Sequence, residues 1–225
     1  MRTIAVIPAY NESARLPAVV RALLPLVDEV VVVDDGSADD TGPAAAAAGA
    51  TVLTHRLNRG QGAALKTGTA AALAAGADLI IHFDADGQHR PDTVPDLLRP
   101  ILDGQADVVL GSRFLGQPAA GMPLSRRLLL WAARQFSAFA LGIPRRFTDP
   151  QSGLRAWRRE VAAAVDFRQD RMAHCSEILR LLAHSDWRVR EVPVRIEYTA
   201  QTLRKGQRAA DAFGIVWQLF LGAWY

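Results

Sequence analysis

The sequence alternates short apolar runs with segments of helical periodicity, and this alternation limits the possible folds more than any other feature. Strands separated by helices form crossover units, which build a mainly parallel sheet with helices on both faces. We therefore predict an α/β protein with a doubly wound sheet. The strands expected in the first half of the chain are 3–7, 30–33, 51–54, 79–83 and 108–110. The helices expected between them are 12–24, 44–48, 62–75 and 93–102.

The second half of the chain continues this pattern less regularly. Its expected elements are an apolar, arginine-bearing helix at 124–141, a loop entering a strand at 147–157, a helix at 173–184 and a strand at 188–198. The 225 residues suffice for one ordinary core or a core with a small appendage. We predict one domain over residues 1–208 and a separate terminal helix over 209–225.

Composition excludes several classes of protein and shows that basic side chains are concentrated in the second half of the chain. The single cysteine, Cys175, excludes a disulfide framework and a thiolate zinc site, and it fits a reducing compartment. Residues 1–112 carry eight basic and 14 acidic side chains, whereas residues 113–225 carry 18 and nine. Residues 113–148 contain six arginines and no acid. This stretch predicts a surface that meets an anion, such as a phosphate, a nucleic acid or an acidic lipid face.

Polar clusters follow four of the predicted strands at the points where they end. The clusters are residues 8–12, 34–37, 58–62 and 84–89. In open α/β sheets the carboxyl ends of the strands line the ligand crevice, so clusters that are distant in sequence converge in space. The sequence therefore predicts a binding site along this edge of the sheet.

The cluster after residue 83 carries the strongest chemical signal. Asp84 and Asp86 can present hard oxygen ligands to Mg²⁺ or Mn²⁺, which in turn bridges a diphosphate, and Gln88 and His89 offer two more ligands. A lone pair of aspartates in a loop more often caps a helix. The buried strand before it and the three other clusters favour the metal site here.

The other clusters bear on nucleotide binding. Asp34 and Asp35 could accept hydrogen bonds from a base or ribose, or could instead cap the helix near residue 44. Residues 60–65 begin like a dinucleotide fingerprint, but Leu65 replaces the third glycine. Residues 62–67 lack the preceding glycine of a P-loop, so a kinase or NTPase is disfavoured.

These motifs, in this order, resemble those of family 2 glycosyltransferases, and most closely the dolichyl- or polyprenyl-phosphate mannose and glucose synthases. The matching segments are 8–12, 34–37, 58–64, 84–89, 111–113 and 149–155. The resemblance covers roughly residues 3–200. It implies a GT-A fold with a nucleotide-sugar site at the carboxyl ends of the strands. It also implies a nucleotide-diphosphate sugar donor, a divalent metal, either Mg²⁺ or Mn²⁺, and inversion at the anomeric carbon.

The resemblance also implies roles for individual residues. The metal ligands would be Asp86 and Gln88, and residues 1–112 would form the nucleotide and metal half, with 113–208 as the acceptor half. Nucleotide-sugar contacts would come from Pro8, Tyr10, Glu12, Asp34, Asp84 and Ala85. Arginines facing the transferring or acceptor phosphate would be Arg113, Arg126, Arg127 and Arg204. The loop at 201–206 lacks the usual Ser-Lys pair, so either Arg204 or Lys205 could take the last of these roles.

The expected reaction is transfer of a hexose, mannose or glucose, to a polyprenyl or dolichyl phosphate. Such a phosphate is already anionic at neutral pH because its second pKa is about 6, so it needs no general base. Asp86 and Arg113 would then catalyse by aligning and neutralising the diphosphate. A glycan hydroxyl acceptor is the alternative, with Asp149 as its catalytic base. Asp149 could equally anchor the turn at 152–153, and a non-catalytic nucleotide-binding subunit of a membrane complex is a further alternative.

Two segments predict contact with a membrane. Residues 124–141 have the pattern of a basic amphipathic helix, although a core-facing helix is the alternative. The terminal segment has an aromatic stripe, formed by Phe213, Trp217, Phe220 and Trp224. No apolar run reaches the length of about 20 residues that spans a bilayer. The apolar stretch at the N-terminus is too short for the core of a signal peptide. We expect a cytoplasmic protein, peripheral on the inner face of the membrane or bound to a membrane partner subunit, without a nucleic-acid partner.

Overall fold

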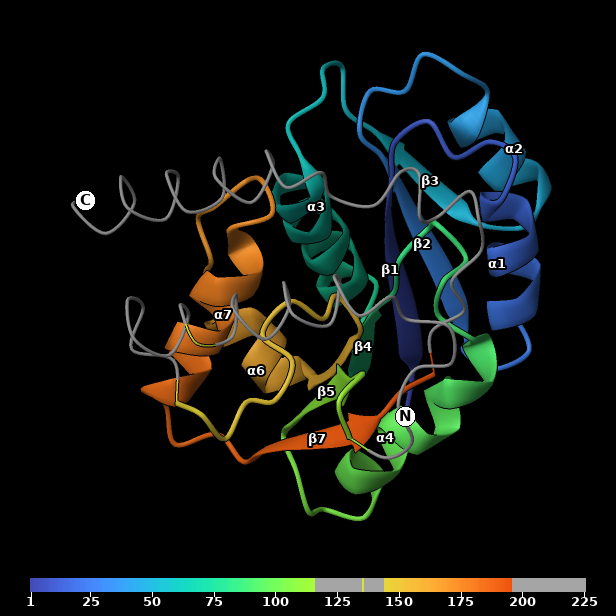
Figure 1. The fold of residues 1–225 in the computed structure, drawn as a ribbon. Helices are drawn as coiled ribbons and strands as arrows, with labels where there is room; N and C mark the ends of the chain where they lie inside the picture. The colour runs from blue at the N-terminus through green and yellow to red at the C-terminus, as the bar shows by residue number, and fades with distance from the viewer. Residues whose placement is uncertain (116–134, 136–143, 196–225) are drawn as a thin grey trace.

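The computed structural model describes residues 1–115, 135 and 144–195, and these build one seven-stranded sheet between two layers of helices (Figure 1). The strand order is β3-β2-β1-β4-β6-β5-β7. The strands are β1 Thr3–Ala9, β2 Glu29–Asp34, β3 Thr51–Thr54, β4 Leu79–His82, β5 Val108–Ser112, β6 Arg155–Arg158 and β7 Val189–Pro193. The helices are α1 Leu16–Leu23, α2 Thr41–Ala47, α3 Gln61–Ala74, α4 Val94–Leu102, α6 Arg159–Ala164 and α7 His174–Ala183, with a 3₁₀ turn, η1, at Pro91–Thr93.

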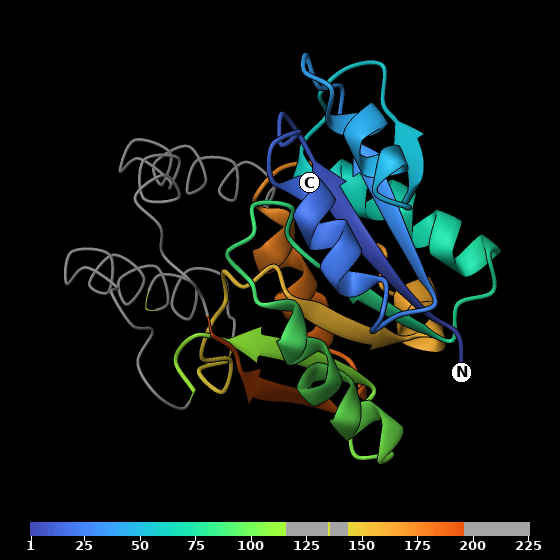
Figure 2. The same ribbon diagram turned by 90° about the vertical axis from the view of Figure 1, so that its right-hand side faces the viewer.

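The prediction of a doubly wound, mainly parallel sheet is confirmed. Strand β1 is parallel to β2 and β4, β2 is parallel to β3, and β5 is parallel to β7. Strand β6 runs antiparallel between β4 and β5. Figure 2 shows β5 and β7 side by side at one edge of the sheet.

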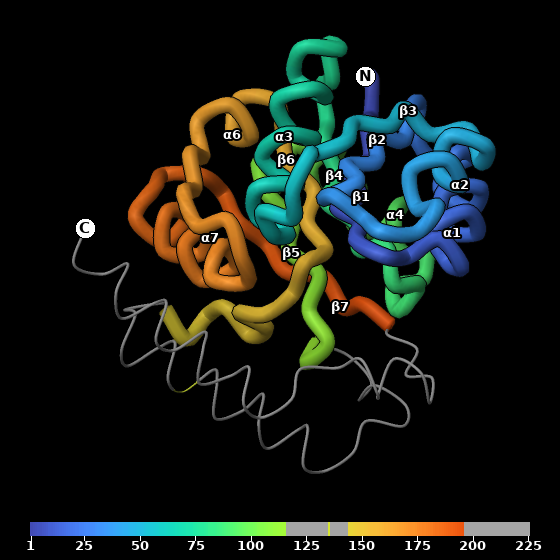
Figure 3. Tube along the Cα trace, turned by 90° about the horizontal axis from the view of Figure 1, so that it is seen from above, coloured from blue at the N-terminus to red at the C-terminus, as the bar shows by residue number. Residues whose placement is uncertain are grey.

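Each face of the sheet packs against its own set of helices (Figure 3). On β1, Ala5 and Ile7 belong to one core with α1, α2 and α4, whereas Ile4 and Val6 belong to the other core with α3, α6 and α7. All seven residues of β1 are buried. The continuous apolar runs of the sequence are the pattern of strands covered on both faces.

The expected elements that fall within the described residues are present, with shifted ends. Helix α1 begins at Leu16, because residues 12–15 form a turn in which the Glu12 carbonyl accepts hydrogen bonds from the backbone N–H of Arg15 and Leu16, at 3.1 and 3.0 Å. Helix α2 begins earlier than expected, at Thr41. The predicted helices at 124–141 and 209–225 lie outside the described residues. Within the described ranges, no helix is both long and apolar enough to cross a bilayer.

Glycine at position 68 lets α3 lie directly on the sheet. A Cβ atom there would come within 2.3 Å of Val6 Cγ1 and 3.1 Å of Val33 Cγ2. Both valines are fully or almost fully buried and β-branched, so neither side chain can turn away easily. The distance between α3 and the strands that carry the predicted site therefore depends on this residue.

We expect Gly68→Ala to lower the free energy of unfolding by about 1–3 kcal/mol, the usual effect of overpacking a filled core. At an open helical position the same change would raise it by about 0.8–1 kcal/mol, because alanine favours the helix. Urea denaturation followed by circular dichroism measures the sign. The control is Ala70→Ser, at an exposed position of the same helix, with an expected change within about 0.5 kcal/mol. A stabilised Gly68→Ala protein would contradict the packing argument.

Candidate functional site

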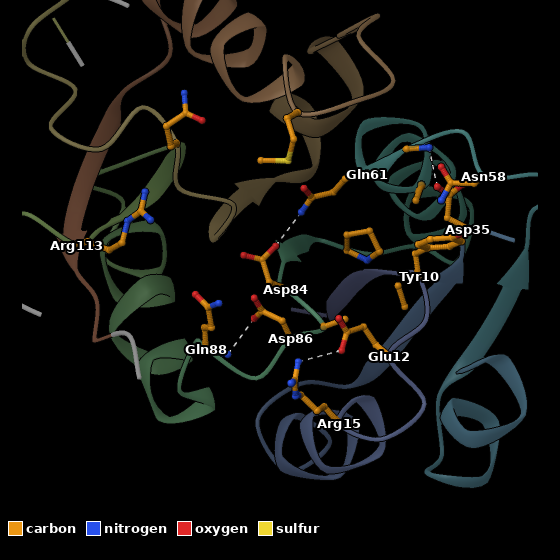
Figure 4. Close-up of a pocket in the computed structure, with 17 residues that line it drawn as sticks. Tyr10, Glu12, Arg15, Asp35, Asn58, Gln61, Asp84, Asp86, Gln88 and Arg113 are labelled. Carbon is orange, nitrogen blue, oxygen red and sulfur yellow. Dashed lines mark hydrogen bonds and ion pairs between the residues drawn. The ribbon is translucent and has the colours of Figure 1, made fainter. Parts of the chain in front are cut away.

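A cleft of about 480 Å³ opens at the carboxyl ends of β1, β2 and β4. All four polar clusters contribute to it, which confirms that they converge at this edge. Asp84 and Asp86 lie in the middle, with Arg113 on one side and Tyr10 and Asp35 on the other (Figure 4). The complete lining is Pro8, Ala9, Tyr10, Glu12, Arg15, Asp35, Asn58, Gly60, Gln61, Ala64, Asp84, Ala85, Asp86, Gln88, Arg113, Gln151 and Met172.

Eight of the predicted site residues are in this lining, and two are not. The eight are Pro8, Tyr10, Glu12, Asp84, Ala85, Asp86, Gln88 and Arg113. Asp34 and Asp149 lie behind the wall of the cleft, as described below. The predicted phosphate-binding residues Arg126, Arg127 and Arg204 lie outside the described residues.

The loop after β1 presents Tyr10 and Glu12 to the cleft. Between them Asn11 adopts a left-handed conformation, with φ of 53°. The Asn11 backbone N–H donates to Ser37 Oγ at 2.9 Å, and Asn11 Oδ1 accepts from the backbone N–H of Ala38 at 2.9 Å. These contacts tie the loop after β1 to the loop after β2. Tyr10 is left 47% exposed at the mouth of the cleft.

Asp34, which the resemblance assigns to the nucleotide, is not among the residues that line the cleft. Asp34 is 6% exposed, accepts the backbone N–H of Ser37 at 3.0 Å, and lies against Gly42 in α2. Its neighbour Asp35 lines the cleft instead. Successive residues along an extended chain point in opposite directions, so only one of the two carboxylates can face the cleft. The sequence alone did not indicate which.

Asp35 is held from three sides. Its Oδ1 accepts from His55 Nδ1 at 2.7 Å and from the backbone N–H of Arg59 at 3.0 Å. Its Oδ2 accepts from the backbone N–H of Gly60 at 2.6 Å. Because a carboxylate only accepts, His55 Nδ1 carries the proton, and His55 Nε2 pairs with Thr67 Oγ1 at 2.9 Å. His55 therefore fixes the orientation of a carboxylate that lines the cleft.

Asp84 and Asp86 differ in their protonation chemistry. Burial alone would raise the pKa of Asp84, but the hydrogen bond and charge of His89 together with the nearby charge of Arg155 lower it. His89 Nε2 is 3.2 Å from Asp84 Oδ2, and Gln61 Nε2 donates to Asp84 Oδ1 at 2.9 Å. Burial and the neighbouring charge of Asp84 instead raise the pKa of Asp86. A cation between the two carboxylates would relieve their repulsion.

The loop that precedes β6 packs closely against the carboxylate of Asp84. A Cβ atom on Gly153 would come within 2.7 Å of Asp84 Oδ1, so only glycine lets the loop approach the carboxylate this closely. Gly153 belongs to the motif at 149–155 that was noted in the sequence, and its neighbour Gln151 lines the cleft.

The acid pair fits a divalent cation that is shared with a ligand. In the described part of the chain, no three His, Cys, Asp or Glu side chains are grouped as metal ligands. Asp84, Asp86 and Gln88 could supply a partial set of oxygen ligands. Mg²⁺ is typically held by one or two carboxylates together with substrate phosphates and water, so a partial set of this kind suits a cation that arrives with a diphosphate.

Arg113 and Asp149 form a close ion pair across 36 residues of sequence. Asp149 Oδ2 accepts from Arg113 Nε at 2.6 Å and from the Arg113 backbone N–H at 3.1 Å, and Asp149 Oδ1 accepts from Arg113 Nη2 at 2.6 Å. The Asp149 side chain is only 1% exposed. In this arrangement both carboxylate oxygens of Asp149 are engaged by Arg113, and Asp149 is not part of the lining. Its role as a catalytic base stays a prediction.

The remaining lining residues were missed or given no role by sequence reasoning. Asn58, Gly60 and Gln61 belong to a recognised cluster, but the sequence gave no reason to assign Gln61 to Asp84. Arg15 and Met172 belong to no motif. No local signal in the sequence could have found them, because Met172 reaches the cleft only through tertiary packing.

That packing explains the glycines of residues 60–62. A Cβ atom on Gly60 would come within 2.5 Å of the Asp170 carbonyl oxygen, and one on Gly62 within 2.1 Å of the Gln169 carbonyl oxygen. The backbone N–H of Ala63 donates to the Asp170 carbonyl at 3.1 Å. The glycines therefore admit the loop before α7, which carries Met172, onto the first turn of α3.

Comparison with known proteins agrees with this geometry. Residues 4–165 match the family described as Glycosyl transferase family 2. The chain is 31% identical over 237 residues to the UDP-N-acetylglucosamine–dolichyl-phosphate N-acetylglucosaminyltransferase of Methanococcus voltae, covering 96% of this chain and 94% of that protein. It is 36% identical over 174 residues to the undecaprenyl-phosphate mannosyltransferase of Micrococcus luteus, covering 74% of this chain and 70% of that protein.

A solved structure shows the same architecture with ligands. Glucosyl-3-phosphoglycerate synthase from Mycobacterium tuberculosis, in complex with Mn²⁺, UDP and glucosyl-3-phosphoglycerate, aligns with a TM-score of 0.70 at 26% identity. The alignment covers 95% of this chain and 75% of that one. The fold and site thus define a GT-A-fold sugar transferase. The chain belongs to glycosyl transferase family 2, which confirms the resemblance inferred from its motifs.

We expect Asp149→Asn to lower the free energy of unfolding by about 3 kcal/mol, because it breaks a largely buried ion pair by removing the charge of one partner. Chemical denaturation measures this loss. The control is Asp166→Asn, since Asp166 is 70% exposed and pairs with Lys66 at the surface, where an ion pair contributes at most about 1 kcal/mol.

The double variant Arg113→Ala/Asp149→Asn separates the two roles of Asp149. Removing both partners leaves no unpaired charge, so the double variant should unfold less readily than Asp149→Asn alone. A catalytic base would behave differently. Asp149→Asn would then lose activity while keeping wild-type stability, and that result would support the base assignment.

Proposed function

We propose that this glycosyltransferase moves a hexose, with mannose and glucose as the first candidates, from a nucleotide-diphosphate sugar to a polyprenyl or dolichyl phosphate, with inversion at the anomeric carbon. One observation carries the proposal. The cleft places an acid pair opposite an arginine whose direction is fixed by Asp149. This charge arrangement suits a metal-bound diphosphate on one side and a second phosphate on the other.

The donor would occupy the part of the cleft between Tyr10 and Asp84. The exposed ring of Tyr10 offers a stacking surface for a base. Asp35 Oδ2 accepts one hydrogen bond within the protein, from Gly60, and retains capacity for another from a base or ribose. The M. tuberculosis structures with UDP support a uridine nucleotide as the first donor to test.

Mg²⁺ or Mn²⁺ would be held by Asp86 and Gln88, with Asp84 close by. Such an ion, when bound, neutralises the charge that develops on the leaving diphosphate. The chain's own groups would orient the donor: Gln61 holds Asp84 in place, and Arg113 presents its guanidinium to the transferring phosphates. The support comes from the raised pKa of Asp86, caused by burial and by Asp84, and from related structures that contain Mn²⁺ or Mg²⁺ with UDP.

The ion pair between Asp149 and Arg113 favours a phosphate acceptor. A hydroxyl acceptor needs a base, and the carboxylate that sequence reasoning offered for this role is engaged by Arg113. A phosphate monoester with a second pKa of about 6 is already a nucleophile at neutral pH. The relatives named for dolichyl phosphate and undecaprenyl phosphate support the same acceptor class.

A lipid acceptor implies work at a membrane surface. We therefore propose that the protein is peripheral on the cytoplasmic face of the membrane, either by its own contacts or through a membrane partner subunit. The arginine-rich, acid-free stretch 113–148 supports this, because basic side chains attract an anionic surface.

A comparison of two acceptors tests the proposal. The full chain is incubated with Mg²⁺, labelled UDP- or GDP-sugars carrying mannose, glucose or N-acetylglucosamine, and vesicles that contain either polyprenyl phosphate or the matched polyprenol. We expect label in the lipid fraction only with the phosphate, in an acid-labile linkage. Arg113→Ala should lower kcat far more than it weakens donor binding.

Other products would point to the alternatives. Transfer to polyprenol, phosphoglycerate or a soluble glycan would replace the lipid phosphate by a hydroxyl acceptor. Failure with every sugar and acceptor, while UDP still binds, would favour the non-catalytic subunit.

The raised pKa of Asp86 predicts a pH dependence of metal binding. A proton competes with the cation at pH values where an ordinary carboxylate would already be ionised. The affinity for Mn²⁺ in the presence of UDP should therefore be full at high pH and fall as the pH is lowered through this raised pKa. Calorimetric titration from about pH 4, near the ordinary pKa of an aspartate, to about pH 8 measures the change.

Two variants locate this effect. Asp86→Asn should bind Mn²⁺ weakly and keep only the pH dependence that the phosphate of UDP contributes, whose second pKa is about 6. Asp92→Asn is the matched control, because Asp92 lies in the η1 turn that follows this loop, is engaged by Arg90 at 3.1 Å and does not line the cleft. If the wild-type affinity stays constant over this range, Asp86 is not a ligand that competes with protons.

A further inference from the structure

Glu191, in the middle of edge strand β7, makes contacts that strand pairing does not require. The strand is already held to β5 by five paired positions, from Val108 with Val189 to Ser112 with Pro193. At its amino end, Asp107 accepts from the Arg188 backbone N–H at 2.9 Å and from Arg188 Nη2 at 2.7 Å. The Glu191 side chain instead contacts residues 148–149, the segment that leads into the candidate site.

Glu191 accepts three donors from this segment. The backbone N–H of Thr148 donates to both carboxylate oxygens, at 2.8 and 3.0 Å, and Thr148 Oγ1 donates to Oε2 at 2.7 Å. The backbone N–H of Asp149 lies 3.4 Å from Oε1. Burial raises the pKa of Glu191, and the donors from Thr148 and Asp149 oppose that rise. The carboxylate and the segment therefore stabilise each other.

A chain of hydrogen bonds links Glu191 to the two residues next to Arg113 in the sequence. Because Thr148 Oγ1 donates its proton to Glu191, it must accept from Ser112 Oγ, which lies at 2.6 Å. Ser112 Oγ in turn accepts the backbone N–H of Phe114 at 3.2 Å. Both neighbours of Arg113 in the chain are thus fixed by a network that begins at Glu191.

The same network fixes the ion partner of Arg113. Glu191 holds the backbone of Asp149, whose carboxylate binds Arg113 through Nε and Nη2 at 2.6 Å each. A small shift of residues 148–149 would therefore turn the guanidinium in the wall of the cleft. Displacements of about 1 Å in a catalytic arrangement can lower rates by about 100-fold.

We propose that Glu191 is a positioning residue, which fixes the Arg113 guanidinium in the cleft through Thr148 and Asp149. The effect on rate rests on the proposed function of Arg113, whereas the effect on the Arg113 side chain does not. The experiment therefore measures the effect on rate and the effect on the Arg113 side chain separately.

The test compares Glu191→Gln with Asp107→Asn in the full chain. Glutamine keeps the shape of Glu191 but turns one acceptor into a donor, which opposes the donors of Thr148. Asp107→Asn makes the same kind of change at the amino end of the same strand pair, away from the cleft. The first readout is the Arg113 Nε–H signal in ¹⁵N NMR spectra, assigned with Arg113→Lys, and the second is kcat and the donor KM.

We expect Glu191→Gln to shift the Arg113 Nε–H signal and speed its exchange with water. It should lower kcat by about 10- to 100-fold, with the donor KM changed by less than about threefold. Asp107→Asn should leave the signal and kcat at wild-type values. If Glu191→Gln does not fold, Thr148→Val, which loses only the hydroxyl link, should show the same changes, and Thr148→Ser should restore wild-type behaviour.

The outcomes distinguish this inference from the proposed function. If Glu191→Gln and Thr148→Val leave the Arg113 signal unchanged, or if Asp107→Asn changes it equally, Glu191 only anchors its strand and the inference is wrong. If the signal shifts but Arg113→Ala retains full activity, the positioning role stands and the proposed role of Arg113 in transfer fails.

Discussion

The structure depends on the burial of its central strands on both faces. A strand covered by helices on each side can carry few polar groups, because unsatisfied polar groups in an apolar interior are strongly destabilising. β1, β2 and β4 are accordingly apolar along most of their length, and a polar cluster follows each of them where the chain leaves the core at the carboxyl end of the strand. Since these strands are parallel, all of those points fall on one edge of the sheet, and that edge becomes the cleft.

The cleft is divided by charge. Asp84 and Asp86 lie in its floor, with the pKa of the first lowered by His89 and Arg155 against burial and the pKa of the second raised by burial and by Asp84. Arg113 faces them from the end of β5, held by Asp149. Acidic residues from the first half of the chain thus oppose a basic residue from the second, as the uneven distribution of charge along the sequence implies.

The sequence was most informative where periodicity or a local motif carries the signal. The strands, the helices and the convergence of four clusters all follow from burial patterns and from the geometry of parallel sheets. Pairings between distant residues did not follow. Asp149 and Arg113 are 36 residues apart, and nothing local distinguishes a base from an ion partner. The choice between Asp34 and Asp35 likewise depends on one residue of strand register, which sequence patterns do not resolve.

The antiparallel insertion of β6 has a consequence for the order of folding. β4 and β5 are not neighbours, and β6 must enter between them before either strand is paired on both sides. β6 and β7 come after residue 154, so the half of the sheet that carries Arg113 can be completed only after that part of the chain has been synthesised. During synthesis β1, β2, β3 and β4 can pair with one another first. The wall that carries the acid pair is then in place before the wall that carries the arginine.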